Sequence, residues 1–297
     1  MIINKEPYKT LFTAVPIKTS KELFAFYNKN NKMKSKSWWV FRGQQDAKWP
    51  LTTAIERLAV KEWKHKYKDL LEIEAGLIRS FHRRFHNYSD YIPEKDDFIE
   101  WLSIMQHHGT ATRLLDCTYS FYAAIFFALE NATPNKKTMS AIWAFDSEWL
   151  VNQILPKLDK DEKKLYGIDS FDKIVTNSKR DNYFLFHRNH KMLSIYPVNA
   201  FKQNKRLIIQ QGVFLAPGNI SKRFIDNLTE ITENAKKRKN HLYCLLLPNT
   251  KDFLEDTIRE LNRMNMNAAT LFPDLDGFSR YLNKGIILKE IIKVEEN

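Results

Sequence analysis

Cysteine, glycine and long apolar runs are scarce in this sequence, and these scarcities exclude several classes of protein. The two cysteines, Cys117 and Cys244, stand far apart and form no Cys-x-x-Cys pair, which argues against a zinc finger and a disulfide-rich scaffold. The longest wholly apolar run, Ala123–Leu129, is too short to cross a bilayer. The first residues, Met1–Phe12, lack the charged start and apolar core of a signal peptide. We therefore expect a cytoplasmic protein with no membrane partner.

Positive charge is in excess. The net charge is +12, and lysine and arginine gather in the segments Lys61–Lys68, Arg79–His86, Lys179–Lys191, Lys202–Arg206 and Lys236–Lys239. A basic excess of this size favours a polyanionic partner such as RNA, DNA or an acidic protein. Clustering along the chain does not place charges together in space, so a solvated lysine-rich surface is the alternative interpretation.

The order of the expected elements indicates an α+β fold. We predict strands at Ser37–Arg42, Ser140–Phe145, Arg206–Leu215 and His241–Leu247. We predict helices at Ser20–Asn28, Thr52–Phe81 (interrupted at Gly76), Lys95–His107, Thr118–Leu129, Asp252–Met264 and Asp274–Asn283. Because regular βαβ spacing is missing, we expect a central, largely antiparallel sheet flanked by helices. No repeat or linker divides the chain, so we expect one domain over residues 1–297, in which Leu158–Asp169 is an insertion or a lid.

The segment Trp38–Arg57 is the first candidate for chemistry. Arg42 ends an apolar strand and is followed at once by Gly43, which predicts a guanidinium group at a sheet edge beside exposed backbone. This arrangement suits bidentate binding of a phosphate or a carboxylate. Gln44 adds a polar group at the same place. The alternative is a structural clamp between Arg42 and a buried aspartate.

The second candidate is Gln106–Glu130, where a helix ends at two adjacent histidines. His107 and His108 point in different directions on a helix, so their spacing does not predict a metal site. Asp116 and Thr118 precede the expected buried helix, and either could cap it. Polar groups that converge on an apolar element are typical of a binding pocket. A capping role for Asp116, or a contact with Arg113 or Arg42, is the alternative to catalysis.

Two later segments interrupt apolar runs with polar side chains. In a strand, one of Gln210 and Gln211 must face inward, and a buried amide requires a partner or a ligand. Asp274 and Asp276 could bind a cation, but we favour a helix cap. Four of only eight glycines fall in the segments considered so far, namely Gly43, Gly109, Gly212 and Gly277. Turn geometry is the alternative explanation for each.

Five blocks in this order resemble the FRG domain family. They are FRG at Phe41–Gly43, QHHGTATRLLDCT at Gln106–Thr118, FYAAIFFA at Phe121–Ala128, QQGVF at Gln210–Phe214 and LFPDLDGF at Leu271–Phe278. The resemblance spans about residues 38–283. Cys117 departs from the pattern, because the family commonly has an aromatic residue after LLD. Members often occur near bacterial toxin–antitoxin and phage-defence genes, which implies an antitoxin protein as a candidate partner.

The layout is also similar, more distantly, to ADP-ribosyltransferases, which implies NAD as co-substrate and no metal. By that resemblance Arg42 would hold the pyrophosphate or ribose, Tyr119 or Tyr122 would stack on nicotinamide, and Gln211 would bind a ribose hydroxyl. Many such transferases have glutamate at the late position, where this chain has glutamine. The implied catalytic set is Arg42, Thr112, Asp116 and Gln211. The implied cofactor-binding set is Arg42, Gly43, Gln44, His107, His108, Arg113, Tyr119, Tyr122 and Gln210.

Three functional hypotheses follow from these patterns and resemblances. The first is a toxin-like, NAD-dependent ADP-ribosyltransferase that modifies a polyanionic target, with RNA favoured over DNA. The second is a non-enzymatic sensor that binds a ligand or nucleic acid through Arg42 and Asp116. The third is a metal-independent nuclease with His107 or His108 as general base. Dependence on NAD separates the first hypothesis from the other two.

Overall fold

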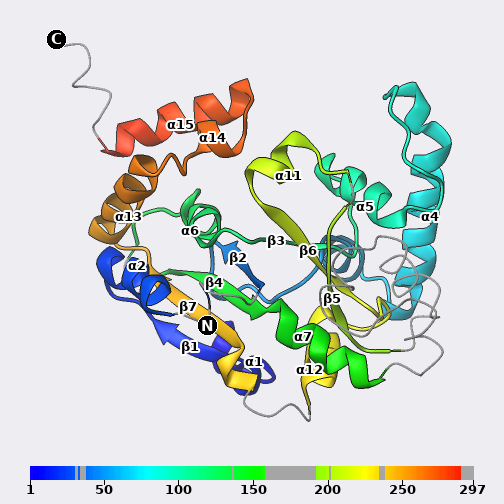
Figure 1. Cartoon of the computed structure of the whole chain (residues 1–297), viewed down its shortest axis with the longest axis horizontal. Helices are drawn as coiled ribbons and strands as arrows, with labels where there is room; N and C mark the ends of the chain where they lie inside the picture. The colour runs from blue at the N-terminus through cyan, green and yellow to red at the C-terminus, as the bar shows by residue number, and fades with distance from the viewer. Residues whose placement is uncertain are drawn as a thin grey trace.

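Seven strands form one mixed sheet within the residues that the computed structural model describes, which are 1–30, 33, 38–135, 137–157, 192–200, 202–233 and 238–288 (Figure 1). The expected insertion Leu158–Asp169 and the basic cluster Lys179–Lys191 lie outside the described residues. The strands are β1 (Thr13–Pro16), β2 (Trp39–Gln44), β3 (Leu115–Thr118), β4 (Met139–Asp146), β5 (Ile195–Val198), β6 (Gly212–Pro217) and β7 (Leu242–Pro248).

The sheet order is β1-β7-β4-β2-β3-β6-β5, and the neighbours β1 and β7 alone run parallel. The α-helices are α1 (Tyr8–Leu11), α2 (Ser20–Lys29), α4 (Leu70–Arg84), α5 (Phe98–His107), α6 (Phe121–Leu129), α7 (Ser147–Ile154), α11 (Lys205–Ile209), α12 (Phe224–Thr232), α13 (Lys251–Arg263), α14 (Ala268–Leu271) and α15 (Leu275–Leu288). The expected α+β fold with a largely antiparallel sheet is confirmed.

Helices cover both faces of the sheet, which explains why its central strands are apolar without alternation. Along β4, Trp143 and Phe145 belong to the core that contains α1 and α12, whereas Ile142 and Ala144 face α2, α6 and α13. A third apolar cluster joins α4, α5 and α7 to β5 and β6 (Figure 1). Among the described residues, no helix combines the length and apolarity that a membrane span requires.

The prediction of a helix from Thr118 was wrong at its start. Leu115–Thr118 is the short strand β3, which pairs with β6 along its whole length. The helix α6 begins at Phe121, and Ser120 caps it by accepting a hydrogen bond from the Ala123 amide at 3.2 Å. Neither Asp116 nor Thr118 is therefore the cap. Four residues are too few for the sequence pattern to separate a strand from the first turn of a helix.

The prediction of one strand over Arg206–Leu215 was also wrong. Lys205–Ile209 forms α11, whose first turn is capped by Asn204, and β6 begins only at Gly212. The chain reverses between them at Gln211, which has a φ of 49°. Gln210 and Gln211 therefore lie between α11 and β6, and they do not point to opposite faces of a strand as was expected.

The long helical stretch expected over Thr52–Phe81 is interrupted, but not at Gly76. A π-helix, η2, spans Glu56–Glu62 and ends before Lys64, where φ is 62°. Gly76 lies inside the continuous helix α4. The expected helices at Ser20–Asn28 and Lys95–His107 correspond to α2 and α5.

Candidate functional site

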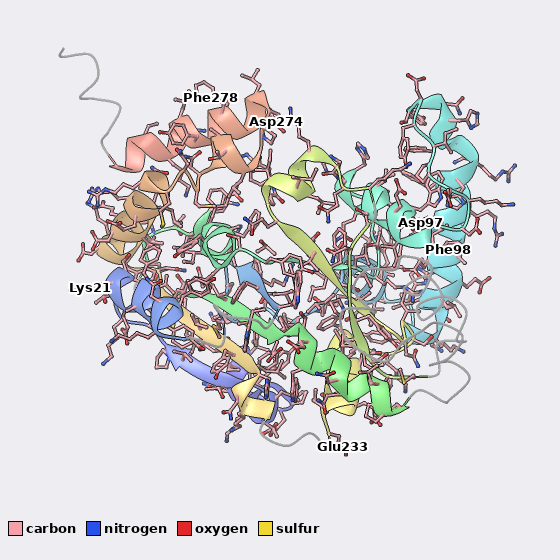
Figure 2. All side chains as sticks on the ribbon, viewed as in Figure 1. Lys21, Asp97, Phe98, Glu233, Asp274 and Phe278 are labelled. Carbon is pink, nitrogen blue, oxygen red and sulfur yellow. The ribbon has the colours of Figure 1, made fainter. Side chains whose placement is uncertain are left out.

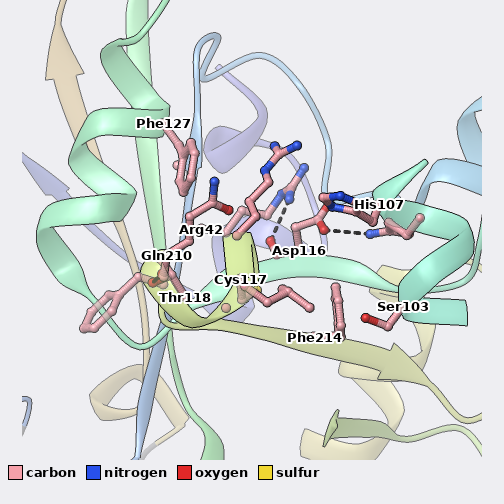
Figure 3. A pocket seen from close by; sticks show the side chains of 15 residues that line it. Arg42, Ser103, His107, Asp116, Cys117, Thr118, Phe127, Gln210 and Phe214 are labelled. Atoms are coloured by element: carbon pink, nitrogen blue, oxygen red, sulfur yellow. Dashed lines mark hydrogen bonds between the residues drawn. The ribbon is translucent and has the colours of Figure 1, made fainter. Parts of the chain in front are cut away.

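A cleft of about 300 Å³ opens where strands β2 and β3 separate (Figure 3). All six residues of β2 pair with β4, but the only pair between β2 and β3 joins Phe41 to Thr118. Beyond this pair β3 follows β6 instead. The divergence leaves Arg42 and Gly43 on one side of an opening and Asp116 on the other. Helices α5, α6 and α11 complete the walls.

Polar side chains from four elements meet in this cleft. Those that line it are Arg42, Ser103, Gln106, His107, Asp116, Thr118, Arg206 and Gln210, and the apolar lining includes Phe41, Phe127, Leu207 and Phe214. Asp116 and Thr118 are alternate residues of β3 and therefore point to the same face of the sheet. The short strand thus directs two polar side chains between α5 and α6.

Arg42 spans the opening between the two strands. Its Nη1 donates a hydrogen bond to the backbone carbonyl of Asp116 at 2.7 Å (Figure 3). Its Nε is buried and has no hydrogen-bond partner among the described residues. Since Arg42 contacts the backbone of Asp116, it leaves the aspartate side chain to other partners. The alternative to ligand binding was a clamp between Arg42 and a buried aspartate. In the structure, the Arg42 side chain is bonded to the backbone of Asp116 and not to its carboxylate.

A relay of side chains holds the Asp116 carboxylate. The Thr112 hydroxyl donates to Oε1 of Gln106, which fixes the amide so that its Nε2 faces Asp116. That Nε2 donates to Oδ1 of Asp116 at 2.8 Å and to the Leu114 carbonyl at 3.3 Å. Thr112 itself is fully buried. Thr112 therefore orients Gln106, and Gln106 orients the exposed carboxylate of Asp116.

Cationic groups surround this carboxylate. Burial lowers the pKa of Arg206, and the negative charge of Asp116 opposes that effect. Burial lowers the pKa of Arg57 as well, with a further decrease from the positive charge of Arg42. Burial and the neighbouring His108 lower the pKa of His107, which favours its neutral imidazole. Asp116 is the one carboxylate among the described lining residues, and the cleft suits an anion.

The ring of Phe272 packs against the guanidinium group of Arg206. The guanidinium carbon of Arg206 lies 4.5 Å from the ring centre of Phe272, and that of Arg280 lies 3.9 Å from the same ring. Arg280 also donates to Glu130 at 2.7 Å. A flat cation above a ring is stabilised by the ring quadrupole. Phe272, which follows α14, therefore helps to position Arg206 at the cleft.

Five residues of the implied catalytic and cofactor-binding sets line the cleft: Arg42, Gly43, His107, Asp116 and Gln210. Gln210 is 9% exposed and donates from Nε2 to the Leu271 carbonyl at 2.9 Å. Gln211 is exposed and does not line the cleft. One amide of the pair is buried, as expected, but it is Gln210 rather than Gln211.

Six other residues of those sets do not line the cleft. The guanidinium group of Arg113 is buried against Glu74, with Nε 2.9 and 2.8 Å from the two carboxylate oxygens. Gln44 is buried and accepts from Nε1 of Trp143 at 2.6 Å. The ring of Tyr122 packs near Phe24. The others are Thr112, His108 and Tyr119, and the Tyr119 hydroxyl accepts from Asn199 at 3.0 Å.

Gly43 is required for packing rather than for ligand contact. A Cβ at this position would lie 2.2 Å from the Ala124 carbonyl oxygen and 2.5 Å from the Ala128 nitrogen. Strand β2 and helix α6 therefore approach each other too closely for any larger residue. At Gly109, by contrast, a φ of 83° explains the glycine.

Sequence reasoning gave no role to several groups at or near the cleft, among them Ser103, Gln106, Phe127, Arg206 and Arg57. Arg206 belongs to a basic cluster that the sequence displays, but the expected strand placed it wrongly. Recognising Asn204 as a helix cap would have corrected that placement. Among the described residues, no three side chains are grouped as a metal ion requires.

Comparison with known protein families matches residues 37–137 to the FRG domain. The matched segment contains β2, α5, β3 and α6, and with them Arg42, Gln106, His107 and Asp116. Arg206 and Gln210, which close the cleft, lie beyond it. No curated protein and no solved structure matches the chain. The chain therefore contains an FRG domain.

Proposed function

We propose that the cleft binds NAD and that the chain is an ADP-ribosyltransferase. The observation that carries this proposal is that Arg42 and Arg206 line the same cleft as Asp116. Guanidinium groups bind phosphate oxygens in pairs of hydrogen bonds, and a carboxylate stabilises developing positive charge. NAD offers a diphosphate to the first and a reacting ribose to the second.

The size of the cleft supports a partly enclosed ligand. Its volume of about 300 Å³ lies at the low end of the range for small-molecule sites. The nicotinamide and its ribose would occupy the cleft, with Phe127 and Phe214 as the apolar walls. The diphosphate would lie between Arg42 and Arg206, where the buried Nε of Arg42 lacks a partner among the described residues.

The proposed transfer follows from these positions. The bond between ribose C1′ and the nicotinamide nitrogen breaks, and its electron pair leaves with neutral nicotinamide. Asp116, held by Gln106, stabilises the resulting oxocarbenium-like ribose. A nucleophilic oxygen or nitrogen of the acceptor then bonds to C1′, and its proton passes to Asp116. Gln210 orients the ribose through its amide oxygen, because its nitrogen is bonded to Leu271.

The proposal includes a biological setting. The FRG domain and the net charge of +12 support a toxin-like protein of a toxin–antitoxin or phage-defence system that modifies a polyanion, with RNA favoured. An antitoxin protein is the proposed regulatory partner.

The second candidate is a sensor that binds without turnover. It is favoured by Gln210, because an amide at this position cannot stabilise a cation by charge. A nuclease is a third candidate, since His107 lines the cleft with a lowered pKa and could act as a general base. Fragments of RNA that form without NAD would identify the nuclease.

The deciding experiment incubates the full chain with NAD labelled in its adenosine half and a pool of RNA, DNA and protein. We expect Arg42→Ala and Asp116→Asn each to reduce nicotinamide release and label transfer by about 100-fold or more. Arg259→Ala is the matched control, because Arg259 lies on α13 and is paired with Asp256. Gln210→Ala is expected to reduce turnover more than Gln211→Ala. Binding of NAD without nicotinamide release would favour the sensor instead.

A further inference from the structure

A second hollow, of about 660 Å³, lies between α4 and α5. Helix α4 contributes Arg79, His82 and Arg83, and the start of α5 contributes Phe98, which lies beside α4 (Figure 2). Lys95 and Asp96 line it from the preceding segment. We call this hollow the α4–α5 groove. None of its lining residues belongs to the cleft between β2 and β3.

The groove carries unpaired positive charge. Arg79 and Arg83 are exposed, and neither forms an ion pair within the described part of the chain. Two arginines with the same spacing on α13, Arg259 and Arg263, are instead paired with acids of their own helix. At the base of the groove, Arg113 and Glu74 neutralise each other. The other charged residues that line the groove are three cations, Arg79, Arg83 and Lys95, and one acid, Asp96.

Flat rings accompany these charges. Phe98 and His82 are stacked with an interplanar angle of 18° and ring centres 6.4 Å apart, and His82 lies 4.1 Å from Trp101. The Nε2 of His82 is buried and has no partner among the described residues. Tyr88 and Tyr91, in the segment after α4, are 84% and 41% exposed but do not line the groove, and Lys202 lies 4.5 Å from the ring centre of Tyr91. Cations beside aromatic rings are the combination that binds single-stranded nucleic acid.

We propose that the α4–α5 groove binds single-stranded nucleic acid, with phosphates against Arg79, Arg83 and Lys95 and a base against Phe98. An acidic peptide would match the charges but would make no use of the Phe98 ring that lines the groove, so this ring favours nucleic acid. The bound strand would be the acceptor of the transferase, and this clause alone rests on the proposed function. Helix α5 connects the groove to the cleft, since Phe98 and His107 lie about 14 Å apart along its axis.

The test measures binding of a fluorescently labelled, mixed-sequence single-stranded RNA to the full chain by anisotropy, without NAD and over a series of salt concentrations. We expect Arg79→Ala/Arg83→Ala to weaken binding by about tenfold or more. The slope of log K against log salt, which is negative, should become less steep by about 1.4, because each lost phosphate contact contributes about 0.7. Phe98→Leu should weaken binding by about fivefold with an unchanged slope, since it removes stacking alone.

Arg259→Ala/Arg263→Ala is the control, because it removes the same two charges at the same spacing from another helix. An equal loss in this control, or an unchanged affinity in the groove variant, would overturn the proposal. Polyglutamate that binds as tightly as RNA, without sensitivity to Phe98→Leu, would also overturn it and indicate an acidic protein. A DNA strand distinguishes recognition of the 2′-hydroxyl from recognition of backbone and bases. Because the assay contains no NAD, failure here is separable from failure of the transferase proposal.

Discussion

Two arginines of the FRG domain, Arg42 and Arg113, have different surroundings and therefore different uses. Arg113 is fully buried, and its guanidinium is held by both carboxylate oxygens of Glu74. Arg42 is half-buried, borders the cleft and keeps a buried Nε without a partner among the described residues. Removing one partner of a buried ion pair is costly, whereas an unsatisfied donor at a cleft is available to a ligand. The geometry favours a structural role for Arg113 and a binding role for Arg42.

Also at the residue scale, a buried carboxyl group makes the free energy of unfolding depend on pH. Glu56 is 1% exposed, and burial raises its pKa from 4.5 to about 7, although hydrogen bonds from Phe224 and Thr53 oppose the shift. Its Oε2 has no partner in the described part of the chain. Between these two pKa values the folded protein holds a proton that the unfolded chain has lost. Raising the pH through this window therefore destabilises the fold.

Glu56→Gln removes the titration while keeping an oxygen that accepts from the Phe224 amide. We expect the variant to gain stability relative to wild type as pH rises from 5 to 8, by up to about 3 kcal/mol. Urea unfolding at several pH values measures the difference. Glu62→Gln, an exposed change in the same π-helix, is expected to show no such trend. A difference between Glu56→Gln and wild type that is constant over this range would contradict the prediction.

At the scale of elements, the contact between β2 and α6 sets one wall of the cleft. The strand carries Phe41 into the core that α6 helps to form, and Gly43 allows the helix backbone to lie directly on the strand. This close contact keeps Phe127 of α6 beside Arg42 at the cleft. The glycine of the FRG tripeptide is thus explained by helix–strand packing.

At this scale we predict opposite effects on stability for the replacement of two glycines by alanine. Gly43→Ala should destabilise the protein by about 3 kcal/mol or more, because its Cβ would overlap backbone atoms that no side-chain motion can clear. Gly76→Ala should stabilise it by about 0.5–1 kcal/mol, since Gly76 lies inside α4 with nothing within 4 Å of the added carbon. Thermal and urea unfolding measure both. A Gly43→Ala protein as stable as wild type would refute the close contact.

At the scale of the whole molecule, the segment that matches the FRG domain contains only part of the sheet. Strand β2 pairs with β4, and β3 pairs with β6, yet β4 and β6 both follow residue 137. Within the matched segment, β2 and β3 share a single residue pair. Arg206 and Gln210 also come from outside the segment. Both the sheet and the cleft therefore depend on the later part of the chain.

We expect residues 37–137 expressed alone not to fold cooperatively, because two strands would lose their principal partners and expose apolar faces. Circular dichroism and urea unfolding of the segment, beside the full chain, test this. A cooperative transition in the isolated segment would contradict the prediction and would indicate that the strands find other partners.

Local signals in the sequence determined much of the fold. Apolar periodicity and caps located α2, α5, α13 and α15, and Asp274 accepts from the Gly277 amide at 2.7 Å, as the favoured cap prediction requires. Apolar runs located β2, β4 and β7. Because both signals lie within a few consecutive residues, the sequence alone displays them. The pattern around Arg42, His107 and Asp116 also identified residues that line the cleft.

Only the tertiary structure decided how the cleft is closed. It placed Arg206 on Phe272, turned Gln210 inward instead of Gln211, and buried Arg113 against Glu74. The strand β3 has four residues and exists because β6 pairs with it. Each of these features depends on contacts between residues far apart in the chain, and such contacts leave no periodic pattern in the local sequence.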